Sequence, residues 1–513
     1  MDLFFENLKI IRSYFEIINK QNLYLFKMEI FSDIFNTLFS HPIWNFLTLV
    51  SCFSILVLSV LFTMMGCSRL RGLKPSADDN ILTNYPKVSV VMCCKGIHEQ
   101  SKSNFIRNMN MQYPGSTEFI FVVESDEDPA AACAREAIAA TTFNSSLVRD
   151  ASVVVAGLSF HNAQKIHNML IGVTSCSDDS DFVLFADDDV FFYPGLLEEL
   201  VAPLVLESNK ILLSTGYEYI APQKGANIWN YCMMTYRLHN LFSFITDRPI
   251  LCWGGCWMAP LWIFRKNFAH LVDCYLDGGY SDDTIVSCLA QQKGYVCAHP
   301  YKAIFPSIPP KNLPFIKYWD FLTRQFFVTD TYSTNYNKRV VHSLAYLIIT
   351  SIWLLVTWIS ISPFIGVLSI LSYFTSDKYI WNYVSTFSTI SLFMWFALAK
   401  SIKFATNAMR DVSNSTRPPE QQTDVNLNEF KIFFGLNIHC FFMPIAVIYI
   451  LISKSIIWSG VKYYKENGKI WKVERKDENG NVVTELFASS ISKALTQTKI
   501  KHLLNGYEDN QFL

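Results

Sequence analysis

Charged residues are scarce in this chain of 513 residues. Asp, Glu, Lys and Arg make up 17% of the sequence, whereas hydrophobic residues make up 51% and include 41 Phe and 12 Trp. In soluble globular domains about a quarter of the residues are charged. The composition therefore excludes an ordinary soluble enzyme, while the length allows one large domain with additional segments.

An excess of charge of either sign is also absent. The formal net charge is −1. Proteins that bind nucleic acid usually carry a clustered basic excess, so we expect no nucleic-acid partner. The sequence also contains no internal repeat and no low-complexity tract.

The Cys-x-x-Cys spacing is missing as well. The 13 Cys are scattered without a Cys-x-x-Cys pair, and Cys252 and Cys256 have no His or Cys cluster near them in the sequence. His161 and His167 also lack the spacing of metal ligands. This pattern predicts reduced, mostly buried thiols on the cytosolic side, and neither a disulfide framework nor a zinc site.

Long apolar segments, in contrast, are present at both ends of the chain. Residues 44–65 carry no charge and are long enough to cross the hydrocarbon core, which takes about 20 residues. They lie too far from the start of the chain to be a cleaved signal peptide. Arg69, Arg71 and Lys74 follow directly and place the next segment in the cytosol. Further apolar candidates are residues 341–373, 379–399 and 432–452, and some of these are expected to lie in the membrane interface instead of crossing.

These segments divide the chain into five predicted parts. An interfacial segment (1–43) precedes a transmembrane helix (44–66), and a domain without long apolar runs follows (80–335). Membrane helices (340–460) and a cytosolic tail (461–513) complete the chain. Either side of the membrane is compatible with the sequence of the polar loop 403–429.

The domain between the anchors shows short apolar runs that alternate with helical patterns. The predicted strands are residues 88–92, 118–123, 152–156, 181–186 and 211–214. An Ala-rich helix is expected over residues 131–140, with Asp128 as its cap and Pro129 at its first position. Strands that alternate with helices predict an α/β domain with a mostly parallel sheet.

Three consecutive carboxylates, Asp187-Asp188-Asp189, end the strand 181–186. In open α/β sheets, ligands bind just beyond the carboxyl ends of the strands. Side chains alternate along an extended chain, so Asp187 and Asp189 point the same way and can share one cation. Mg²⁺ is typically held by one or two carboxylates together with substrate phosphates. The alternative is a solvated acidic turn.

Other polar residues have two interpretations each. Glu124 and Asp128 follow the strand 118–123 and suit contact with a nucleotide ring or ribose, although Asp128 is equally suited to capping the helix. Asp283 precedes a helical run and is either a helix cap or a general base that takes a proton from an acceptor hydroxyl. Lys165 and Asn168, one helical turn apart, either reach a pyrophosphate or uracil or form a solvated helix face.

Together these motifs resemble the inverting nucleotide-sugar glycosyltransferases with the GT-A fold, and among them the ceramide glucosyltransferases, especially the plant-type branch. The resemblance spans roughly residues 45–465. The segments that carry it are Cys94-Lys95-Gly96, Glu124-Ser125 with Glu127-Asp128-Pro129-Ala130, Gln164-Lys165-Ile166-His167-Asn168, Asp187-Asp188-Asp189, Trp253-Gly254-Gly255-Cys256 with Arg265-Lys266, Arg324-Gln325-Phe326-Phe327-Val328 with Thr331-Tyr332, and Trp458-Ser459-Gly460 with Tyr463.

Two departures limit what can be carried over. The animal-type enzymes have Arg-x-x-Arg-Trp where this chain has Arg324-Gln325-Phe326-Phe327-Val328, so the roles of that element do not transfer whole. Ser125 stands where the animal-type motif has its first Asp, which leaves Glu124 or Asp128 as the substitute.

The resemblance implies transfer of glucose from UDP-glucose to the primary hydroxyl of ceramide, with inversion. It implies that Asp187 and Asp189 hold Mg²⁺ or Mn²⁺, that Asp283 is the base, and that Arg324 and Gln325 lie near the leaving pyrophosphate. The implied donor-binding residues are Lys95, Glu124, Asp128, Lys165 and Asp187. For Arg324 the alternative is a residue that extends its charge to the membrane interface.

The implied location is a multi-pass protein of the Golgi or endoplasmic reticulum with its catalytic domain in the cytosol. Two other functions stay open. A membrane polysaccharide synthase of the same fold usually carries Gln-x-x-Arg-Trp, which is absent here. An inactive membrane scaffold or sugar-nucleotide sensor is disfavoured because Asp187, Asp189 and Asp283 are all present.

Overall fold

The computed structural model describes residues 42–73, 82–141, 148–244, 246–343, 345, 378–425, 427–476 and 482–483. The chain consists of two compact units, one comprising Met1–Val60 with Thr350–Lys400 and the other Leu61–Ile349 with Ser401–Leu513. The described part of the first unit is formed by the beginnings of two long helices, α2 (Pro42–Leu70) and α13 (Lys378–Ser415). Both helices end in the second unit.

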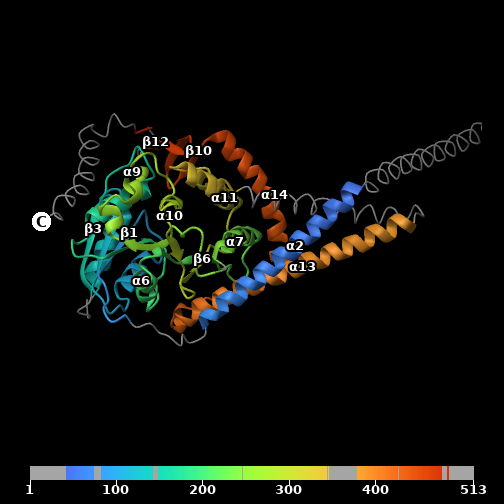
Figure 1. Ribbon diagram of the computed structural model, residues 1–513, viewed down its shortest axis with the longest axis horizontal. Helices are drawn as coiled ribbons and strands as arrows, with labels where there is room; N and C mark the ends of the chain where they lie inside the picture. Colours follow the sequence, from blue (N-terminus) through green and yellow to red (C-terminus); the bar gives the residue numbers. More distant parts are fainter. Residues whose placement is uncertain are drawn as a thin grey trace, which may run out of the picture. The chain divides into compact units, whose positions relative to one another are not determined.

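A seven-stranded sheet with the order β3-β2-β1-β4-β7-β5-β8 forms the centre of the second unit (Figure 1). Its strands are β1 (Val88–Cys93), β2 (Thr117–Val123), β3 (Val148–Val155), β4 (Phe182–Asp187), β5 (Ile211–Thr215), β7 (Cys256–Pro260) and β8 (Val296–Ala298). β7 runs antiparallel to β4 and β5, and the other pairings are parallel. This confirms the predicted mostly parallel α/β sheet.

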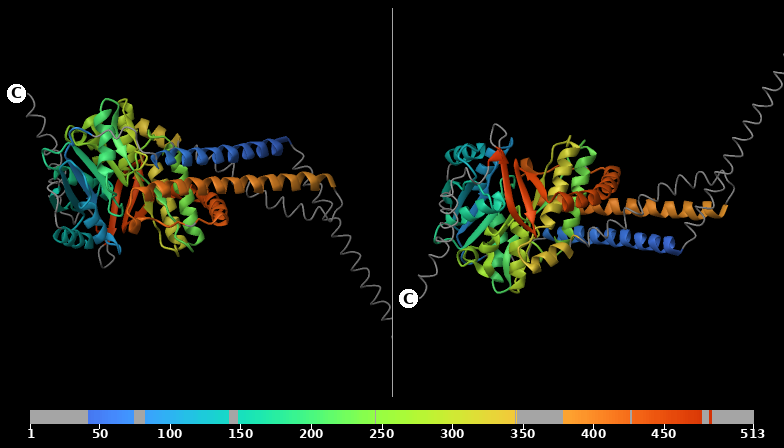
Figure 2. Two further views of the ribbon diagram at one scale, coloured as in Figure 1. Left: turned by 90° about the horizontal axis from the view of Figure 1, so that it is seen from below. Right: turned by 90° about the horizontal axis from the view of Figure 1, so that it is seen from above.

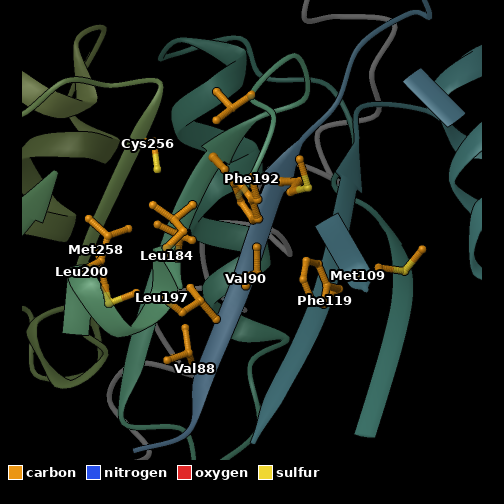
Figure 3. Close-up of a cluster of buried hydrophobic side chains, with 14 of the residues drawn as sticks. Val88, Val90, Met109, Phe119, Leu184, Phe192, Leu197, Leu200, Cys256 and Met258 are labelled. Carbon is orange, nitrogen blue, oxygen red and sulfur yellow. The ribbon is translucent and has the colours of Figure 1, made fainter. Parts of the chain in front are cut away.

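Helices cover this sheet and enclose an apolar core. They are α3 (Ser101–Met109), α4 (Pro129–Ala140), α5 (Gln164–Thr174), α6 (Leu196–Leu206) and α10 (Asp282–Gln292). Figure 3 shows Val88 and Val90 of β1, Leu184 of β4, and Leu197 and Leu200 of α6 in one buried cluster. The continuous apolar run of β4 is typical of a parallel strand that is covered on both faces.

The strand register determines where the site forms. Cys93, the last residue of β1, pairs with Val122 of β2 on one side and with Asp187 of β4 on the other. The carboxyl ends of these three strands therefore meet at one edge of the sheet, where open α/β sheets bind their ligands.

A helical layer with a small second sheet adjoins this edge. Two parallel strands, β6 (Tyr217–Ile220) and β9 (Ile304–Ser307), form the sheet, and the main helices are α7 (Ile228–Asn240), α11 (Phe315–Thr329) and α14 (Glu429–Ser453). Residues 335–343 are also helical. The shorter helices are η1 (Arg71–Leu73), η2 (Leu241–Phe244), α8 (Trp262–Arg265), η3 (Phe268–His270), α9 (Leu271–Leu276) and η4 (Pro419–Gln421).

An antiparallel sheet follows α14, where the sequence analysis expects a tail. It contains β10 (Ser455–Trp458), β11 (Val461–Glu466), β12 (Lys469–Lys476) and β13 (Val482–Val483). The turns Ser459-Gly460 and Asn467-Gly468 have positive φ at both residues, as the type I′ turn of a two-residue hairpin requires. In both views of Figure 2 the red strands lie against the α/β sheet.

Two helical stretches among the described residues are long and apolar enough to cross a membrane, Cys52–Leu73 and Glu429–Ser453. They overlap the predicted segments 44–66 and 432–452. Of the other two apolar candidates, residues 379–399 lie within α13, whereas residues 341–373 are described only at 341–343 and 345. Residues 1–41 of the predicted interfacial segment also lie outside the described ranges.

Candidate active site

A cavity of about 430 Å³ opens at the carboxyl edge of the sheet. This volume falls within the roughly 300–1,000 Å³ that is typical of small-molecule sites. The predicted site residues that line it are Lys95, Glu124, Lys165, Asp187, Asp189, Asp283, Arg324 and Gln325. The cavity thus brings together the predicted residues from the ends of β1, β2 and β4 and from α5, α10 and α11. Of the predicted site residues, only Asp128 does not line it.

Asp187 and Asp189 lie at the end of β4, with Lys165 of α5 beside them. Lys165 Nζ lies 2.8 Å from Oδ1 of Asp187 and donates to the carbonyl oxygen of Gly254 at 2.7 Å. Burial by itself lowers the pKa of Lys165, but the carboxylates of Asp187 and Asp282 raise it above its usual value. Lys165 is therefore a fixed cation of the site and not part of a solvated helix face.

The acidic turn after β4 carries more negative charge than Lys165 neutralises. Asp189 is exposed to the cavity, but the surrounding protein shields its carboxyl group from bulk water, and this desolvation together with Asp187 and Glu218 raises its pKa to about 7. Desolvation and the neighbouring Asp189 likewise raise the pKa of Asp188 to about 7. A cation bound in the turn would stabilise the charged forms of both Asp188 and Asp189.

The donor set fits a hard divalent cation that is shared with a substrate. Among the described residues no three His, Cys, Asp or Glu side chains are arranged as the ligands of one metal ion. Two carboxylates suffice, however, where substrate phosphates complete the shell of Mg²⁺. Asp187 and Asp189 supply oxygen ligands of that kind. Lys165 pairs with Asp187, and the negative charge of Asp189 beside this pair favours a further cation.

Asp283 and Asp282 begin α10 and have different surroundings. Asp283 lines the cavity, and its carboxylate accepts hydrogen bonds from the backbone amides of Gly254 at 3.1 Å and Thr284 at 2.8 Å. The hydroxyl of Ser281 donates a third hydrogen bond at 2.5 Å. These three donors hold the carboxylate in one orientation, as a general base requires.

Asp282 is the more enclosed of the two carboxyl groups. Its Oδ2 accepts a hydrogen bond of 3.0 Å from Trp257 Nε1, and its Oδ1 lies 3.8 Å from Lys165 Nζ. Desolvation raises its pKa to about 6, although Lys165 opposes the shift. Asp282 was not predicted as a site residue, and its role here is to hold Lys165 and the start of α10 in place.

Glu124 lines the cavity, whereas Asp128 caps a helix. Glu124 lines the cavity between two cations, Lys95 Nζ at 2.7 Å and Arg475 Nη1 at 3.0 Å. Desolvation acts to raise the pKa of Glu124, but the two cations lower it below its usual value. Asp128 accepts hydrogen bonds from the amides of Ala130 and Gly96. It therefore caps α4 and fixes the loop that carries Lys95.

Arg324 and Gln325 of α11 complete the cavity on the side of the helical layer. The guanidinium carbon of Arg324 lies 4.2 Å from the centre of the Trp458 ring, in the turn region of the C-terminal sheet. Such stacking of Arg on Trp is a favourable cation–π contact. Arg324 thus lies in the site and is held there by a residue from the C-terminal sheet.

Several further residues at the cavity were not predicted as site residues. Glu218, Arg237, Gln164 and Tyr463 line the cavity, and Arg475 does not line it but bonds two residues that do. Arg237 of α7 and Glu218 of β6 form a shielded ion pair at the cavity wall. Arg475 of β12 bonds Glu124 and Gln164, and the hydroxyl of Tyr463 accepts a hydrogen bond from the Gln164 amide at 3.3 Å. No motif around Glu218, Arg237 or Arg475 marks them in the sequence, because only the fold brings them to the cavity.

A comparison with protein families found a match to part of the chain. Residues 51–227 match the family model described as Glycosyl transferase family 21. No curated protein sequence matches the chain.

Solved structures that resemble the chain share little sequence with it. A mannosyltransferase from Pyrobaculum calidifontis in complex with GDP-Man and Mn²⁺ has 12% identity over 72% of this chain and 100% of its own, with a TM-score of 0.40. Glucosyl-3-phosphoglycerate synthase from Mycobacterium tuberculosis in complex with Mg²⁺ and UDP has 12% identity over 47% of this chain and 78% of its own, with a TM-score of 0.28. Similarities this distant carry no conclusion about substrates. The family match covers residues 51–227, about a third of the chain, and supports a glycosyltransferase.

Proposed function

We propose that the protein transfers glucose from UDP-glucose to the primary hydroxyl of ceramide, with inversion at the anomeric carbon. The observation that carries this proposal is the convergence of Asp187, Asp189 and Asp283 on one cavity with Lys165, Arg324 and Gln325. The family match over residues 51–227 supports sugar transfer. The choice of glucose and ceramide follows the motif resemblance.

The donor would lie along the carboxyl edge of the sheet. Glu124, held by Lys95 and Arg475, is placed to contact the ribose or base, as acidic residues after strands do in nucleotide-binding folds. Asp187 and Asp189 would hold Mg²⁺ or Mn²⁺. The metal would supply charge neutralisation for the departing diphosphate.

Asp283 is the proposed base. The acceptor hydroxyl gives its proton to the Asp283 carboxylate while its oxygen forms a bond to the anomeric carbon. The bond between that carbon and the phosphate oxygen breaks, and UDP leaves with the electron pair. A single displacement inverts the anomeric carbon and needs no enzyme nucleophile. Proton transfer by a positioned base contributes about 10²–10⁴-fold to the rate.

Arg324, Gln325 and Lys165 are the donors for the leaving group. Negative charge grows on the diphosphate as the glycosidic bond to UDP breaks. Hydrogen-bond donors and cations that are fixed before the reaction stabilise such charge without a reorganisation cost. The ring of Trp458 fixes Arg324, and Asp187 and Gly254 fix Lys165.

A lipid acceptor accounts for the apolar side of the cavity. Phe321, Val328 and Met233 line it beside Arg324 and Gln325. A two-chain lipid stays in the bilayer, because each buried methylene contributes about 0.8 kcal/mol. The enzyme must therefore work at the membrane, and we propose the cytosolic face of the Golgi or endoplasmic reticulum.

Purified protein in lipid vesicles tests this function. Labelled UDP-glucose and ceramide should yield a lipid-soluble product with one sugar per ceramide, and UDP-galactose should yield much less. A label that enters a water-soluble or insoluble polymer would contradict the proposal. No transfer from any nucleotide sugar to ceramide would do so as well.

A further inference from the structure

Helix α14 (Glu429–Ser453) is apolar around its whole circumference, although only one face is packed. Ile432, Leu436, His439, Met443, Ala446 and Ile450 are buried. At 100° per residue these six positions fall within about 80° of one another. The opposite face carries large apolar residues that are exposed to 43–77%: Phe434, Phe441, Ile445, Ile448 and Ile452.

The packed face rests on α7 and α11 along the length of the helix. Near its start, Gly435 lies so close to Tyr231 of α7 that an added Cβ would come within 2.7 Å of the Tyr231 Cβ. At mid-helix, the hydroxyl of Tyr318 in α11 lies 2.9 Å from His439 Nδ1. Near its end, Ile450 lies with Phe326 of α11 in a small apolar pocket.

The segment before α14 and the first turn of the helix are bound to the α/β sheet and helical layer around the cavity, here called the catalytic unit. Lys431 Nζ donates to the carbonyl oxygen of Ala226 at 2.6 Å, and Thr423 lies within 3.0 Å of the Tyr219 hydroxyl. Arg417 stacks on Tyr193 and donates to the carbonyl oxygen of Phe191. Tyr193 and Phe191 follow the acidic turn of β4, so this end of α14 lies on the same side of a membrane as the active site.

The segment after α14 is bound to the same unit. The chain enters β10 directly at Ser455. Trp458 then contacts Arg324, and Arg475 of β12 bonds Glu124. Both of these partners line the catalytic cavity. The two ends of α14 are therefore on one side.

We infer that α14 does not cross the membrane but lies along its surface, with the stripe of Phe434, Phe441, Ile445, Ile448 and Ile452 in the lipid of one leaflet. A crossing helix needs its ends on opposite sides of a hydrocarbon core about 30 Å thick, and the contacts at both ends exclude this. Soluble proteins seldom expose a contiguous apolar stripe of this kind, which marks a membrane or protein contact.

The bilayer is the occupant that fits the stripe. Its five side chains fall within about 60° of one another and run over about five turns, as in helices that lie in the interface. The stripe contains no charged residue, and Cys52–Leu73 of the same chain is apolar and long enough to hold the protein at a membrane. Helix α11, on which α14 packs, contributes Arg324 and Gln325 to the cavity, so this contact places the site beside the leaflet that holds the acceptor.

A depth measurement on the full chain tests the orientation. A fluorescent amino acid is introduced in turn at Phe434, Phe441 and Ile448, in vesicles whose lipids carry bromine at shallow or deep positions. A control probe replaces the exposed Lys210 at the start of β5. We expect similar shallow quenching at the three α14 positions and none at the control. Deep quenching at Phe441 with shallow quenching at the other two would overturn the inference, and so would the absence of quenching at all three.

Sidedness provides an independent readout that does not depend on enzyme activity. Protease-cleavable tags are placed after Glu420 in η4 and after Lys476 at the end of β12, in sealed vesicles. The inference requires that both tags are cut or that both are protected. One cut tag and one protected tag would show a crossing and would overturn it.

Discussion

The guanidinium of Arg475 in β12 donates a hydrogen bond of 3.0 Å to the carboxylate of Glu124 at the end of β2, although 351 residues separate the two in the chain. Both side chains are shielded, with 7% and 14% of their surface exposed. The C-terminal sheet thereby holds the proposed nucleotide-binding residue in place.

Arg475→Met should weaken donor binding more than turnover. The change leaves Glu124 with Lys95 as its one remaining ion-pair partner among those described, and removing one partner of a buried pair typically costs about 3–5 kcal/mol. We expect the KM for UDP-glucose to rise at least about tenfold and protease sensitivity to appear within residues 455–476. Lys472→Met, on the exposed side of the same strand, is the matched control and should change neither quantity. Equal behaviour of the two variants would contradict the positioning role of Arg475.

Asp283→Asn should lower the transfer rate by about 10²–10⁴-fold, because the amide cannot accept the acceptor proton. UDP binding, measured by calorimetry, should stay near the wild-type value, since the proposed role of Asp283 is toward the acceptor. Asp273→Asn, at the surface in α9, serves as the control. An active Asp283→Asn variant would remove Asp283 from the role of base.

Cation binding should depend on pH with a defined sign. The pKa values of Asp188 and Asp189 are raised to about 7, whereas an unfolded Asp has a value of about 3.9. Groups with a raised pKa stabilise the fold most below about pH 4, and this contribution is lost as the pH rises through about 7. Above about pH 7 the charged carboxylates of the acidic turn repel one another, and a bound cation relieves this repulsion.

Mn²⁺ with UDP should therefore raise the Tm more at about pH 8 than at about pH 6, relative to UDP alone. Thermal unfolding in detergent, with and without a chelator, provides the measurement. Asp189→Asn should abolish most of the increase. An increase that is larger at the lower pH would contradict the proposed cation site.

The sequon Asn414-Ser415-Thr416 should carry no glycan. The side chain of Asn414 donates to the carbonyl oxygen of Thr423 at 3.1 Å and accepts from its amide at 2.9 Å. Arg417, three residues on, packs on the catalytic unit, and we propose that this unit faces the cytosol. Treatment with a glycosidase should leave the mobility of the protein unchanged. A shift that disappears in Asn414→Gln would place the catalytic unit in the lumen.

The parallel sheet and its acidic turn could be read from the sequence because their signals are local. The apolar run before Asp187-Asp188-Asp189 and the Asp128-Pro129 helix start determine their own structures. Asp187, Asp189 and Asp283 could also be assigned to one site, since strand ends and helix starts gather at one sheet edge.

The C-terminal sheet and its contacts could not be fully read in the same way. The Asn467-Gly468 turn is a strong local signal for a hairpin, although residues 461–513 were predicted only as a cytosolic tail. The pairing of Arg475 with Glu124 has no local signal, because it depends on how α14 leads the chain back to the cavity. The sequence also does not show which face of α14 packs on the protein and which is exposed, since both faces are apolar.

Lipid mass spectrometry of cells that carry the active protein, the Asp283→Asn variant or no copy tests the central claim most directly. The account predicts ceramide bearing a single β-linked glucose in the first case and its loss in the other two. A ceramide profile that is identical in all three, or glucose that is found in a polymer, would contradict it.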